Sequence, residues 1–503
     1  MEQEQTDETP LTDESLLSIE ELKAATHGTV IGFAENEKNF YFGSVATDSR
    51  QVVPGTLFVP LIGEFQDGHK YIPQAIEKGA TVIFLTLTVY EENPQYYMNI
   101  ASENHCVIFI AVHNNLKALQ DAARCYVKKF PSLIKIGITG SSGKTTTKEI
   151  CASIFRQKYN VVTTVGNFNS ETGLPLSVFN IRKEHEAGIF ELGMNRENEI
   201  GEIARVLKPN YAIITNIGHA HIGILGSQEN IAKEKKKIFT YINEDGAAVI
   251  HEKDSFAQFL AEDVKGKVIY FGADISEEKS GVKFIEDLGI DGTKFSIDGI
   301  ETVLKIPGRY NYLNALSCIA LARELKLSAR EIADGISKIK PPESRSNIQT
   351  VITKKDSTGN SKKILVLKDC YNANPDSMES ALEMCAGLNV KGRKIYILGD
   401  MFELGDNSVE AHSKIGAAAV VSNADMLVFI GHDMEYAANA AKLGGKLHVK
   451  YFADLNDENL NDLCSKLLNY LKDDDFVFVK ASHGMHLEKI INNIQEEEIK
   501  AEN

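Results

Sequence analysis

One stretch near residue 140 constrains this chain more than any other. An apolar run at Ile134–Ile138 leads into the glycine-rich turn Thr139–Gly143, and a helical pattern follows at Lys144–Tyr159. A strand that enters a glycine turn and then a helix points backbone N–H groups and a helix N-terminus at one spot, which favours anions. We therefore predict a phosphate-binding loop, with Lys144 near the β- and γ-phosphates of a nucleotide and the Thr145 hydroxyl on Mg²⁺.

The spacing of this loop differs from the strict GxxxxGK[ST] pattern. Ile138 stands five residues before Gly143, and the nearest earlier glycine within the loop is Gly140. A chance Gly-Lys-Thr sequence is the alternative, but the flanking strand and helix favour nucleotide binding. The residues predicted to bind the nucleotide here are Gly140, Ser141, Ser142, Gly143, Lys144, Thr145 and Thr146.

Two later side chains stand where metal ligands of such a site are expected. Glu191 ends the apolar run Gly188–Phe190, and His221 lies just beyond the strand candidate Tyr211–Ile217. Ligands of open α/β sheets gather at the carboxyl ends of the strands, so we expect both side chains to bind the metal. The alternatives are a salt-bridged surface carboxylate and a loop histidine. The run Lys233–Lys237 by itself indicates a solvated basic face, and a lysine beside a phosphate is its alternative.

Apolar runs alternate with helical patterns over most of the chain, which predicts an α/β fold with mostly parallel sheets. The stretch Val268–Ile306 has strand-like runs and few helical signals, so we expect a small antiparallel addition there. After Pro341-Pro342 the alternation starts afresh. The predicted strands are Phe40–Val45, Thr56–Pro60, Thr81–Leu85, Cys106–Val112, Ile134–Ile138, Gly188–Leu192, Tyr211–Ile217, Ala247–Ile250, Lys363–Leu367, Lys394–Leu398, Met426–Ile430, Leu447–Phe452 and Phe476–Val479.

A chain of 503 residues exceeds what one hydrophobic core usually serves, so two to four domains are expected. We predict a disordered acidic tail at 1–15, an α/β domain at 16–113, a central phosphate-binding domain at 114–345 and a Rossmann-like domain at 346–503. The acidic start has no signal-peptide pattern, and no window reaches the length of a membrane span.

The net charge of −16 disfavours nucleic acid as the main partner, because phosphate backbones bind basic surfaces. Anionic small molecules need only local positive charge. The seven cysteines are scattered, without a CxxC pair. This pattern suits reduced thiols in a cytosol, so a cytoplasmic location is expected.

The motifs GITGSSGKTT (137–146), FELGM (190–194), TNIGHAHIG (215–223) and IAKEKKKIF (231–239) occur in the order seen in the Mur ligases of peptidoglycan synthesis. That family uses GxxGK[ST], which matches the loop's spacing. The resemblance continues through GNFNSETGLP (166–175), PGRYNYLNAL (307–316), LKDCYNANPDSM (367–378) and LGDMFELG (398–405). It implies three domains: one for a UDP-sugar substrate, a central ATPase domain and a C-terminal Rossmann-like domain.

The resemblance also implies roles for single residues. Lys144, Glu191, His221 and Lys235 would be catalytic, the last three with Thr145 as metal ligands and Lys235 as a carbamate. Residues implied to contact ATP beyond the loop are Asn311, Asn314, Arg345 and Asp369. Residues implied to bind the other substrates are Thr47, Asp48, Ser49, Arg50, Asp67, Gly68, His69, Asn167, Asn169, Asn372, Asn374 and Ser377. Departures from the family pattern are Tyr310, Lys237, Ser170, His483 and the segment His251–Asp254.

Within the family, the motifs DCYNANPDSM and LGDMFELG are most similar to the member that joins D-alanyl-D-alanine to UDP-N-acetylmuramoyl-tripeptide. No Asp-Asn-Pro-Arg motif of the tripeptide-forming member is present. The resemblance thus implies an amide ligase that uses ATP and Mg²⁺ and forms an acyl phosphate. We expect the protein to be a monomer. Another ligase of the Mur, folylpolyglutamate or cyanophycin type is the main alternative. A nucleotide switch is disfavoured, since the chain lacks the Asn-Lys-x-Asp guanine motif.

Overall fold

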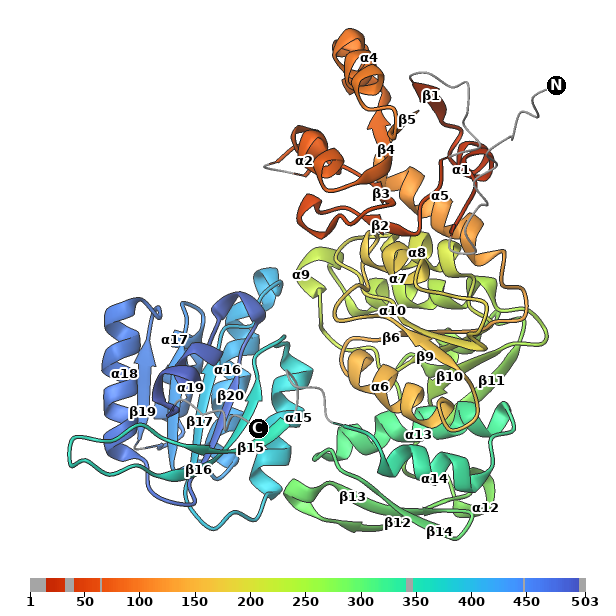
Figure 1. Cartoon of the computed structure of the whole chain (residues 1–503). Helices are drawn as coiled ribbons and strands as arrows, with labels where there is room; N and C mark the ends of the chain where they lie inside the picture. Colours follow the sequence, from red (N-terminus) through yellow and green to blue (C-terminus); the bar gives the residue numbers. More distant parts are fainter. Residues whose placement is uncertain (1–14, 32–39, 64–65, 341–346, 447, 497–503) are drawn as a thin grey trace, which may run out of the picture. The chain divides into compact units, whose positions relative to one another are not determined.

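The computed structural model describes residues 15–31, 40–63, 66–340, 347–446 and 448–496 (Figure 1). Two predictions lie outside these residues. They are the disordered tail, except for Ser15, and the ATP contact of Arg345. The chain divides into two compact units. One contains residues 1–137, 160–194 and 198–210, and the other contains residues 138–159, 195–197 and 211–503.

The first unit contains a five-stranded sheet in the order β1-β5-β4-β3-β2. Strands β2 to β5 run parallel, and β1 is antiparallel to β5. Strands β4 and β5 are continuous apolar runs, as expected for strands covered on both faces. The strand bounds are β1 Thr29–Ile31, β2 Ser44–Ala46, β3 Thr56–Phe58, β4 Ala80–Thr86 and β5 Ile108–Val112.

Four helices of the first unit were not indicated by the sequence patterns: α1, α3, α4 and α7. Helix α1 begins with a capping box at Ser18 and Glu21, and α4 begins with Pro94 after an Asn93 cap. Both are local start signals that favour a helix. Helix α5 packs against α7 and α8. The helix bounds are α1 Ile19–Thr26, α2 Ile72–Glu77, α3 Leu87–Glu92, α4 Pro94–Glu103, α5 Asn115–Val127, α7 Gly173–Val178 and α8 Glu199–Leu207.

The central sheet has six strands in the order β11-β10-β9-β6-β8-β7. Strand β7 pairs parallel with β8, and β10 pairs parallel with both β9 and β11. The bounds are β6 Ile134–Thr139, β7 Val161–Thr163, β8 Ala187–Glu191, β9 Tyr211–Ile214, β10 Ala247–His251 and β11 Lys267–Phe271. The predicted strands at β6, β8, β9 and β10 are confirmed. Strand β7 escaped sequence analysis because three residues at a sheet edge carry little periodicity.

One strand in the middle of the chain was not separated from its surroundings by sequence analysis. A small antiparallel addition was predicted within Val268–Ile306, and β11, which overlaps the start of this stretch, pairs in parallel with β10. The short helix α11 (Ala257–Ala261) lies between the two strands, and a crossover through a helix returns the chain to a parallel position. The antiparallel addition is confirmed for the rest of the stretch. It consists of β12 Val282–Asp287, β13 Thr293–Ile297 and β14 Ile300–Leu304.

The turn between β13 and β14 shows how local sequence determines this addition. Asp298 and Gly299 have φ of 45° and 83°, both in the left-handed region. A two-residue hairpin turn of this kind matches the twist of its strands and favours Asp-Gly. Behind the phosphate loop, α6 packs against α13 and α14. The helices of this part are α6 Lys144–Phe155, α9 Ile222–Leu225, α10 Gln228–Lys236, α12 Glu277–Ser280, α13 Arg309–Glu324 and α14 Ala329–Ser337.

The C-terminal sheet has the order β15-β16-β20-β17-β18-β19. All its pairs are parallel except the edge pair β15 and β16. The strands are β15 Asn347–Ile352, β16 Lys363–Asp369, β17 Lys394–Gly399, β18 Met426–Ile430, β19 Val449–Phe452 and β20 Phe476–Lys480. The α/β fold class with mostly parallel sheets is confirmed.

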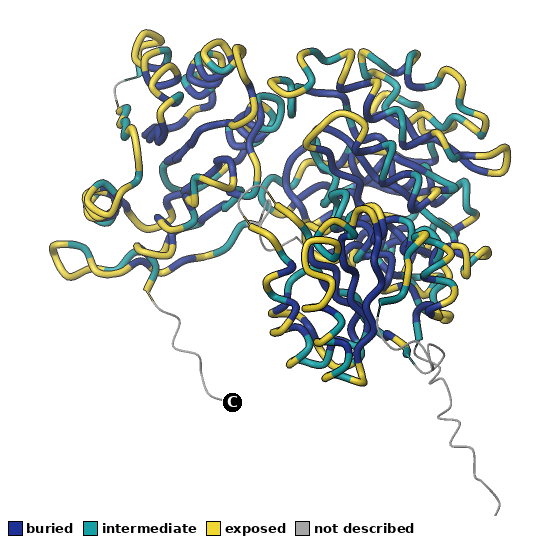
Figure 2. The backbone as a smooth tube through the Cα atoms, turned by 90° about the horizontal axis from the view of Figure 1, so that it is seen from above, coloured by how far each residue is buried: buried dark blue, intermediate teal, exposed yellow. Residues whose placement is uncertain are grey.

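Alternate residues of these strands enter two different hydrophobic cores. Leu398 and Phe478 belong to one core, while Ile397 and Val479 belong to the other, since successive strand side chains point to opposite faces. Every residue of β17, β18 and β20 is buried, and buried backbone fills the interior in Figure 2. The covering helices are α15 Pro375–Gly387, α16 Ser408–Val421, α17 Met434–Leu443, α18 Asp457–Tyr470 and α19 Glu488–Ile494.

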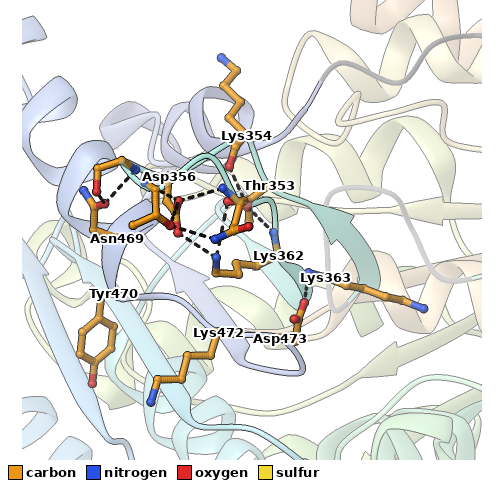
Figure 3. Close-up of polar contacts among 12 residues, drawn as sticks. Thr353, Lys354, Asp356, Lys362, Lys363, Asn469, Tyr470, Lys472 and Asp473 are labelled. Atoms are coloured by element: carbon orange, nitrogen blue, oxygen red, sulfur yellow. Dashed lines mark hydrogen bonds and ion pairs between the residues drawn. The ribbon is translucent and has the colours of Figure 1, made fainter.

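The connection between β15 and β16 is ordered by one carboxylate (Figure 3). Asp356 accepts hydrogen bonds from the Thr358 N–H, the Asn360 N–H and the Lys362 ammonium, at 2.8, 3.0 and 2.8 Å. The Lys362 hydrogen bond, followed by that from the Thr358 hydroxyl, holds the pKa of Asp356 well below its usual range. Asn469 of α18 accepts from the Ser357 N–H at 3.1 Å. These contacts fix a loop whose sequence shows no strand or helix pattern.

Candidate active site

The phosphate loop begins where β6 ends, and its two glycines are required by close neighbours. Gly140 has φ of 155°, and a Cβ there would overlap the Thr215 hydroxyl. Gly143, with φ of 80°, precedes α6, and its Cβ would lie 2.7 Å from Asn314 Oδ1. Only glycine fits both positions without strain. The loop therefore presents backbone at its surface, as binding of phosphate oxygens requires.

The segment after β9 holds the phosphate loop in shape. The Thr215 hydroxyl donates to the Ser142 carbonyl at 2.6 Å, and the Ser142 N–H donates to Asn216 Oδ1 at 3.0 Å. The Ser141 hydroxyl accepts from the Gly218 N–H at 2.8 Å. Sequence analysis assigned no role to Thr215 or Asn216. The position of both next to a strand end within TNIGHAHIG was the available signal.

Two lysines converge on one carbonyl of the loop. Lys144 Nζ and Lys235 Nζ each donate to the Gly140 oxygen at 3.0 Å. Lys235 is almost completely buried, at 1% exposure. Burial, and then the charge of Lys144, lower the pKa of Lys235 well below its usual range, against a smaller opposite effect of Glu234. The prediction of a solvated basic face is therefore wrong for Lys235, because the helical turn aims this side chain at the loop.

The two hydroxyls that follow Lys144 differ in exposure. Thr145 is the second residue of α6 and is partly exposed, while Thr146 is buried. The N-terminal N–H groups of a helix lack partners within the helix and favour negative charge. With two lysine ammoniums beside them, they form a local positive site in an acidic protein.

His221 follows β9 and lies close to both lysines. Burial is the largest cause of its lowered pKa. The hydrogen bond with Glu403 acts in the opposite direction, and the charges of Lys235 and Lys144 add to the lowering. The distance from His221 Nδ1 to Glu403 Oε2 is 2.5 Å. Glu403 belongs to LGDMFELG, yet sequence analysis gave it no role. Its partner lies 182 residues away.

The start of α15 also contacts the phosphate loop. The Asn374 amide donates to the Ser142 hydroxyl at 3.2 Å, and Asn374 caps α15 by accepting from the Ser377 N–H at 2.9 Å. Asp376 accepts from the His219 N–H at 2.6 Å and contacts the ring Nδ1 at 2.9 Å. The structure thus brings Asn374 and Ser377 to the predicted nucleotide site, and it adds Asp376.

Asp369 and Asn372 meet through a lysine that sequence analysis missed. Lys480 Nζ lies 2.5 Å from Asp369 Oδ2 and donates to the Asn372 carbonyl at 3.0 Å. Its side chain is buried at 2% exposure. Strands β16 and β20 are neighbours with Asp369 opposite Lys480, and this pairing could not be read from the sequence.

Asn311 and Asn314 both lie in the first turns of α13 and are buried. The Asn311 amide donates to the Pro307 carbonyl at 2.7 Å, and the Asn314 amide donates to Asn311 Oδ1 at 3.3 Å. Asn314 packs against Gly143. The two amides therefore support the phosphate loop from the side of α13. Tyr310, a departure from the family pattern, points its hydroxyl to Met384 Sδ at 3.7 Å.

The other compact unit contains the remaining predicted metal ligand. Glu191 ends β8 and is buried at 1% exposure. The Asn169 amide donates to Glu191 Oε1 at 2.7 Å, and the Asn169 carbonyl accepts from the Gly193 N–H at 2.8 Å. The carbonyl of Asn167 accepts from the Asn169 N–H at 2.7 Å. Asn169, one of the two asparagines predicted from GNFNSETGLP, thus contacts the predicted carboxylate.

The residues predicted for a UDP-sugar occupy two capped turns of the same unit. Asp48 accepts from the Arg50 N–H and pairs with its guanidinium, which is mostly exposed. Ser49 is buried and donates to Gln74 Oε1 at 2.7 Å, and Thr47 is partly exposed. Arg50 therefore has the most exposed side chain of this turn.

The second turn is braced from inside by His69. Its Nδ1 donates to Asp67 Oδ1 at 2.6 Å, while its Nε2 accepts from the Thr86 N–H at 3.2 Å. Both ring nitrogens are used and the residue is buried, so His69 supports the turn and its ring does not face a ligand. Gly68 is required because a Cβ would lie 2.8 Å from the Leu61 backbone.

No group of three or more His, Cys, Asp or Glu side chains that could hold a metal ion occurs among the described residues. The predicted donors are a hydroxyl, a carboxylate, an imidazole and a lysine carbamate, and Mg²⁺ usually also takes oxygens from substrate phosphates. A cavity of 1390 Å³ lies elsewhere in the second unit, lined by Glu252, Tyr270, Leu316, Arg323 and neighbouring residues. It contains none of the predicted site residues.

Family models match almost the whole described chain. The Mur ligase catalytic domain matches residues 42–126, the middle domain residues 138–322, and the glutamate ligase domain residues 356–483. This chain belongs to the Mur ligase family. The match of all three parts in order confirms the three-domain architecture, with the central phosphate loop inside the middle domain.

Curated relatives agree over nearly their full length. The chain is 41% identical over 482 residues to the UDP-N-acetylmuramoyl-tripeptide–D-alanyl-D-alanine ligase of Treponema pallidum, covering 94% of this chain and 98% of that relative. It is 33% identical to the ligase of the same name from Bacillus subtilis, covering 90% and 93%.

Solved structures show the same architecture. A MurF crystal structure from Acinetobacter baumannii matches with a TM-score of 0.78 at 27% identity, covering 94% of this chain and 97% of that one. A MurF ligase from Thermotoga maritima, solved in complex with ADP, has the same fold, with a TM-score of 0.70 at 24% identity and 90% and 96% coverage. Among the described helices of this chain, none is long and apolar enough to cross a membrane.

Proposed function

We propose that this protein is an ATP-dependent ligase that joins the carboxylate of UDP-N-acetylmuramoyl-tripeptide to the amine of D-alanyl-D-alanine. The observation that carries the proposal is the convergence of Lys144 and Lys235 on the Gly140 carbonyl at the start of α6. It provides the positive site that a nucleotide triphosphate needs. The 41% identity to the Treponema ligase supports the choice of substrates.

The reaction activates a carboxylate that is otherwise a poor acyl donor. The substrate carboxylate oxygen attacks the γ-phosphorus of ATP, so that ADP leaves and an acyl phosphate forms. The amine of D-alanyl-D-alanine then attacks the acyl carbon, loses a proton, and phosphate leaves as the amide forms. Lys144 and the N–H groups of α6 stabilise the crowded negative charge. Water must be excluded, because it would hydrolyse the acyl phosphate.

Thr145, Glu191, His221 and a carbamylated Lys235 would hold Mg²⁺, which neutralises charge on the phosphates. The buried Lys235 fits carbamylation, since its lowered pKa favours the neutral amine. That amine adds carbon dioxide by forming an N–C bond and releasing a proton. The product is an anion beside the Lys144 ammonium, whose charge stabilises it.

We further propose that residues 16–113 bind the UDP-sugar, residues 114–345 bind ATP and residues 346–503 bind the dipeptide. Arg50 and Asp67 would contact the UDP-sugar, and Asn372 and Asn374 would lie where the acyl phosphate meets the amine. We also propose a cytoplasmic monomer that binds small molecules, and the acidic net charge disfavours nucleic acid as a partner.

The test is an assay of phosphate release with ATP and a UDP-N-acetylmuramoyl-tripeptide. D-alanyl-D-alanine should stimulate release and yield the pentapeptide by mass spectrometry, and tripeptides with different third residues would define the acceptor. Stimulation of phosphate release by other substrate pairs would change this assignment. If a diamino acid stimulates it with the UDP-N-acetylmuramoyl-dipeptide, or glutamate stimulates it with a folate, the protein belongs to another branch of the family.

A further inference from the structure

Glu403 and His221 make a contact between two loops that follow different sheets. His221 lies after β9 of the central sheet, and Glu403 lies after β17 of the C-terminal sheet. Glu403 Oε2 is 2.5 Å from His221 Nδ1. The histidine side chain is only 12% exposed. Its backbone φ of 67° is unusual for a residue other than glycine, and such backbone is often found at functional positions.

The position of Glu403 does not depend on its side chain. Its carbonyl accepts from the Gly223 N–H at 2.9 Å, and Gly223 approaches Gly405 so closely that a Cβ would meet the backbone there. Ile222 packs against the hydrophobic core on one face of the C-terminal sheet. Backbone and apolar contacts therefore dock the two loops and bring the carboxylate to the ring.

A carboxylate can only accept a hydrogen bond from the ring, so Nδ1 must carry the proton. In a neutral imidazole the lone pair is then on Nε2, which is the arrangement that a metal-binding histidine needs. The charges of Lys144 and Lys235 also act on the ring. A cation bound there needs a ring held in one orientation.

We propose that Glu403 is a positioning residue that fixes His221 in the Nδ1–H form, with the Nε2 lone pair available to the divalent cation of the ligase reaction. The proposal rests on the proposed function for the identity of that cation. Because Glu403 reaches His221 only when the two loops are docked, docking of the C-terminal sheet completes this metal ligand. Binding of the cation that acts on ATP is thereby linked to docking of the C-terminal domain, which we propose to bind the amine substrate.

The first test reads the ring itself and needs no substrate. Long-range ¹H–¹⁵N spectra of the histidine-labelled full chain, with His221→Gln to assign the signal, distinguish the Nδ1–H, Nε2–H and doubly protonated forms. Wild type should show Nδ1–H. Glu403→Ala should mix the two neutral forms, while Glu403→Gln, whose amide oxygen still accepts, should retain Nδ1–H. An Nε2–H or doubly protonated ring in wild type, or an unchanged ring in Glu403→Ala, overturns the proposal.

The second test measures Mn²⁺ binding by electron paramagnetic resonance in the presence of a non-hydrolysable ATP analogue. Glu403→Ala should weaken binding by about 10- to 100-fold, the usual effect of removing a partner of a metal-bound histidine. Glu403→Gln should remain near wild type. Glu410→Ala is the matched control, because Glu410 is exposed on α16 and pairs with Lys414. Equal Mn²⁺ affinity in wild type and Glu403→Ala overturns the proposal.

The two tests separate this inference from the proposed function. If wild type fails to bind Mn²⁺ but the ring changes in Glu403→Ala as expected, the positioning contact stands and the metal assignment fails. Thermal melting of each variant verifies folding, and the contact between the Glu403 carbonyl and Gly223 should survive both substitutions at Glu403.

Discussion

Thr215→Val tests how the segment after β9 supports the phosphate loop. Its hydroxyl donates to the Ser142 carbonyl at 2.6 Å, and the next donor to that carbonyl, the Asn216 amide, is at 3.4 Å. Valine has nearly the same shape but no hydroxyl. Leaving a buried acceptor poorly satisfied costs about 1–3 kcal/mol. We therefore expect the free energy of unfolding to fall by about 2 kcal/mol.

Thr139→Val is the matched control, one strand away. Thr139 is buried, its carbonyl accepts from the Thr215 N–H at 2.9 Å, and its hydroxyl has no hydrogen-bond partner among the described residues. Burying a hydroxyl without a partner costs about 1–3 kcal/mol in proteins. The same substitution should therefore leave stability unchanged or raise it by about 1 kcal/mol.

The assay is thermal or urea unfolding of both variants, with ATP affinity measured by calorimetry. In a folding unit of 150–250 residues, each kcal/mol shifts the melting midpoint by about 2–4 °C. Thr215→Val should also weaken ATP binding by about tenfold, or about 1.4 kcal/mol, because the loop loses its shape. Equal effects of the two substitutions on stability and on ATP binding would refute the reasoning.

Three further predictions concern the lysines. Lys144→Ala should reduce ligation by about a hundredfold or more, and rates within about tenfold of wild type in a phosphate-release assay would contradict the loop assignment. Lys235 has a folded pKa below its unfolded value, so the unfolded chain binds more protons between the two values and stability rises with pH in that window. In bicarbonate-free buffer, Lys235→Met should therefore be more stable than wild type at low pH by about 1–4 kcal/mol. Unfolding measured from pH 7 upwards should show this difference in the free energy of unfolding becoming smaller. A difference that stays constant with pH would contradict the prediction. Lys480→Met should destabilise by about 3 kcal/mol, because it leaves Asp369 without its buried partner. Adding Asp369→Asn should restore part of the loss in a double-mutant cycle, and strict additivity would argue against the pair.

Much of the fold follows from local patterns. Strands such as β4, β17 and β18 are apolar runs bounded by turn residues, and their burial requires no knowledge of distant segments. Weak local signals explain what sequence analysis missed. Strand β7 has three residues, and the edge strand β15 pairs antiparallel in an otherwise parallel sheet. The partner of a strand is a property of the whole sheet, which is why the parallel pairing of β11 with β10 was not predicted.

The phosphate loop is the part that the sequence by itself determined. Glycines, a preceding strand and a following helix lie within about twenty residues, so local backbone geometry and the helix terminus predict an anion site there. Only the tertiary structure determines which distant side chains contact the phosphate loop. Lys235 reaches Gly140 across 95 residues, Thr215 reaches Ser142 across 73, and Glu403 reaches His221 across 182. Such contacts depend on strand order and on the docking of separate sheets, and no local pattern encodes which distant loops will share one edge.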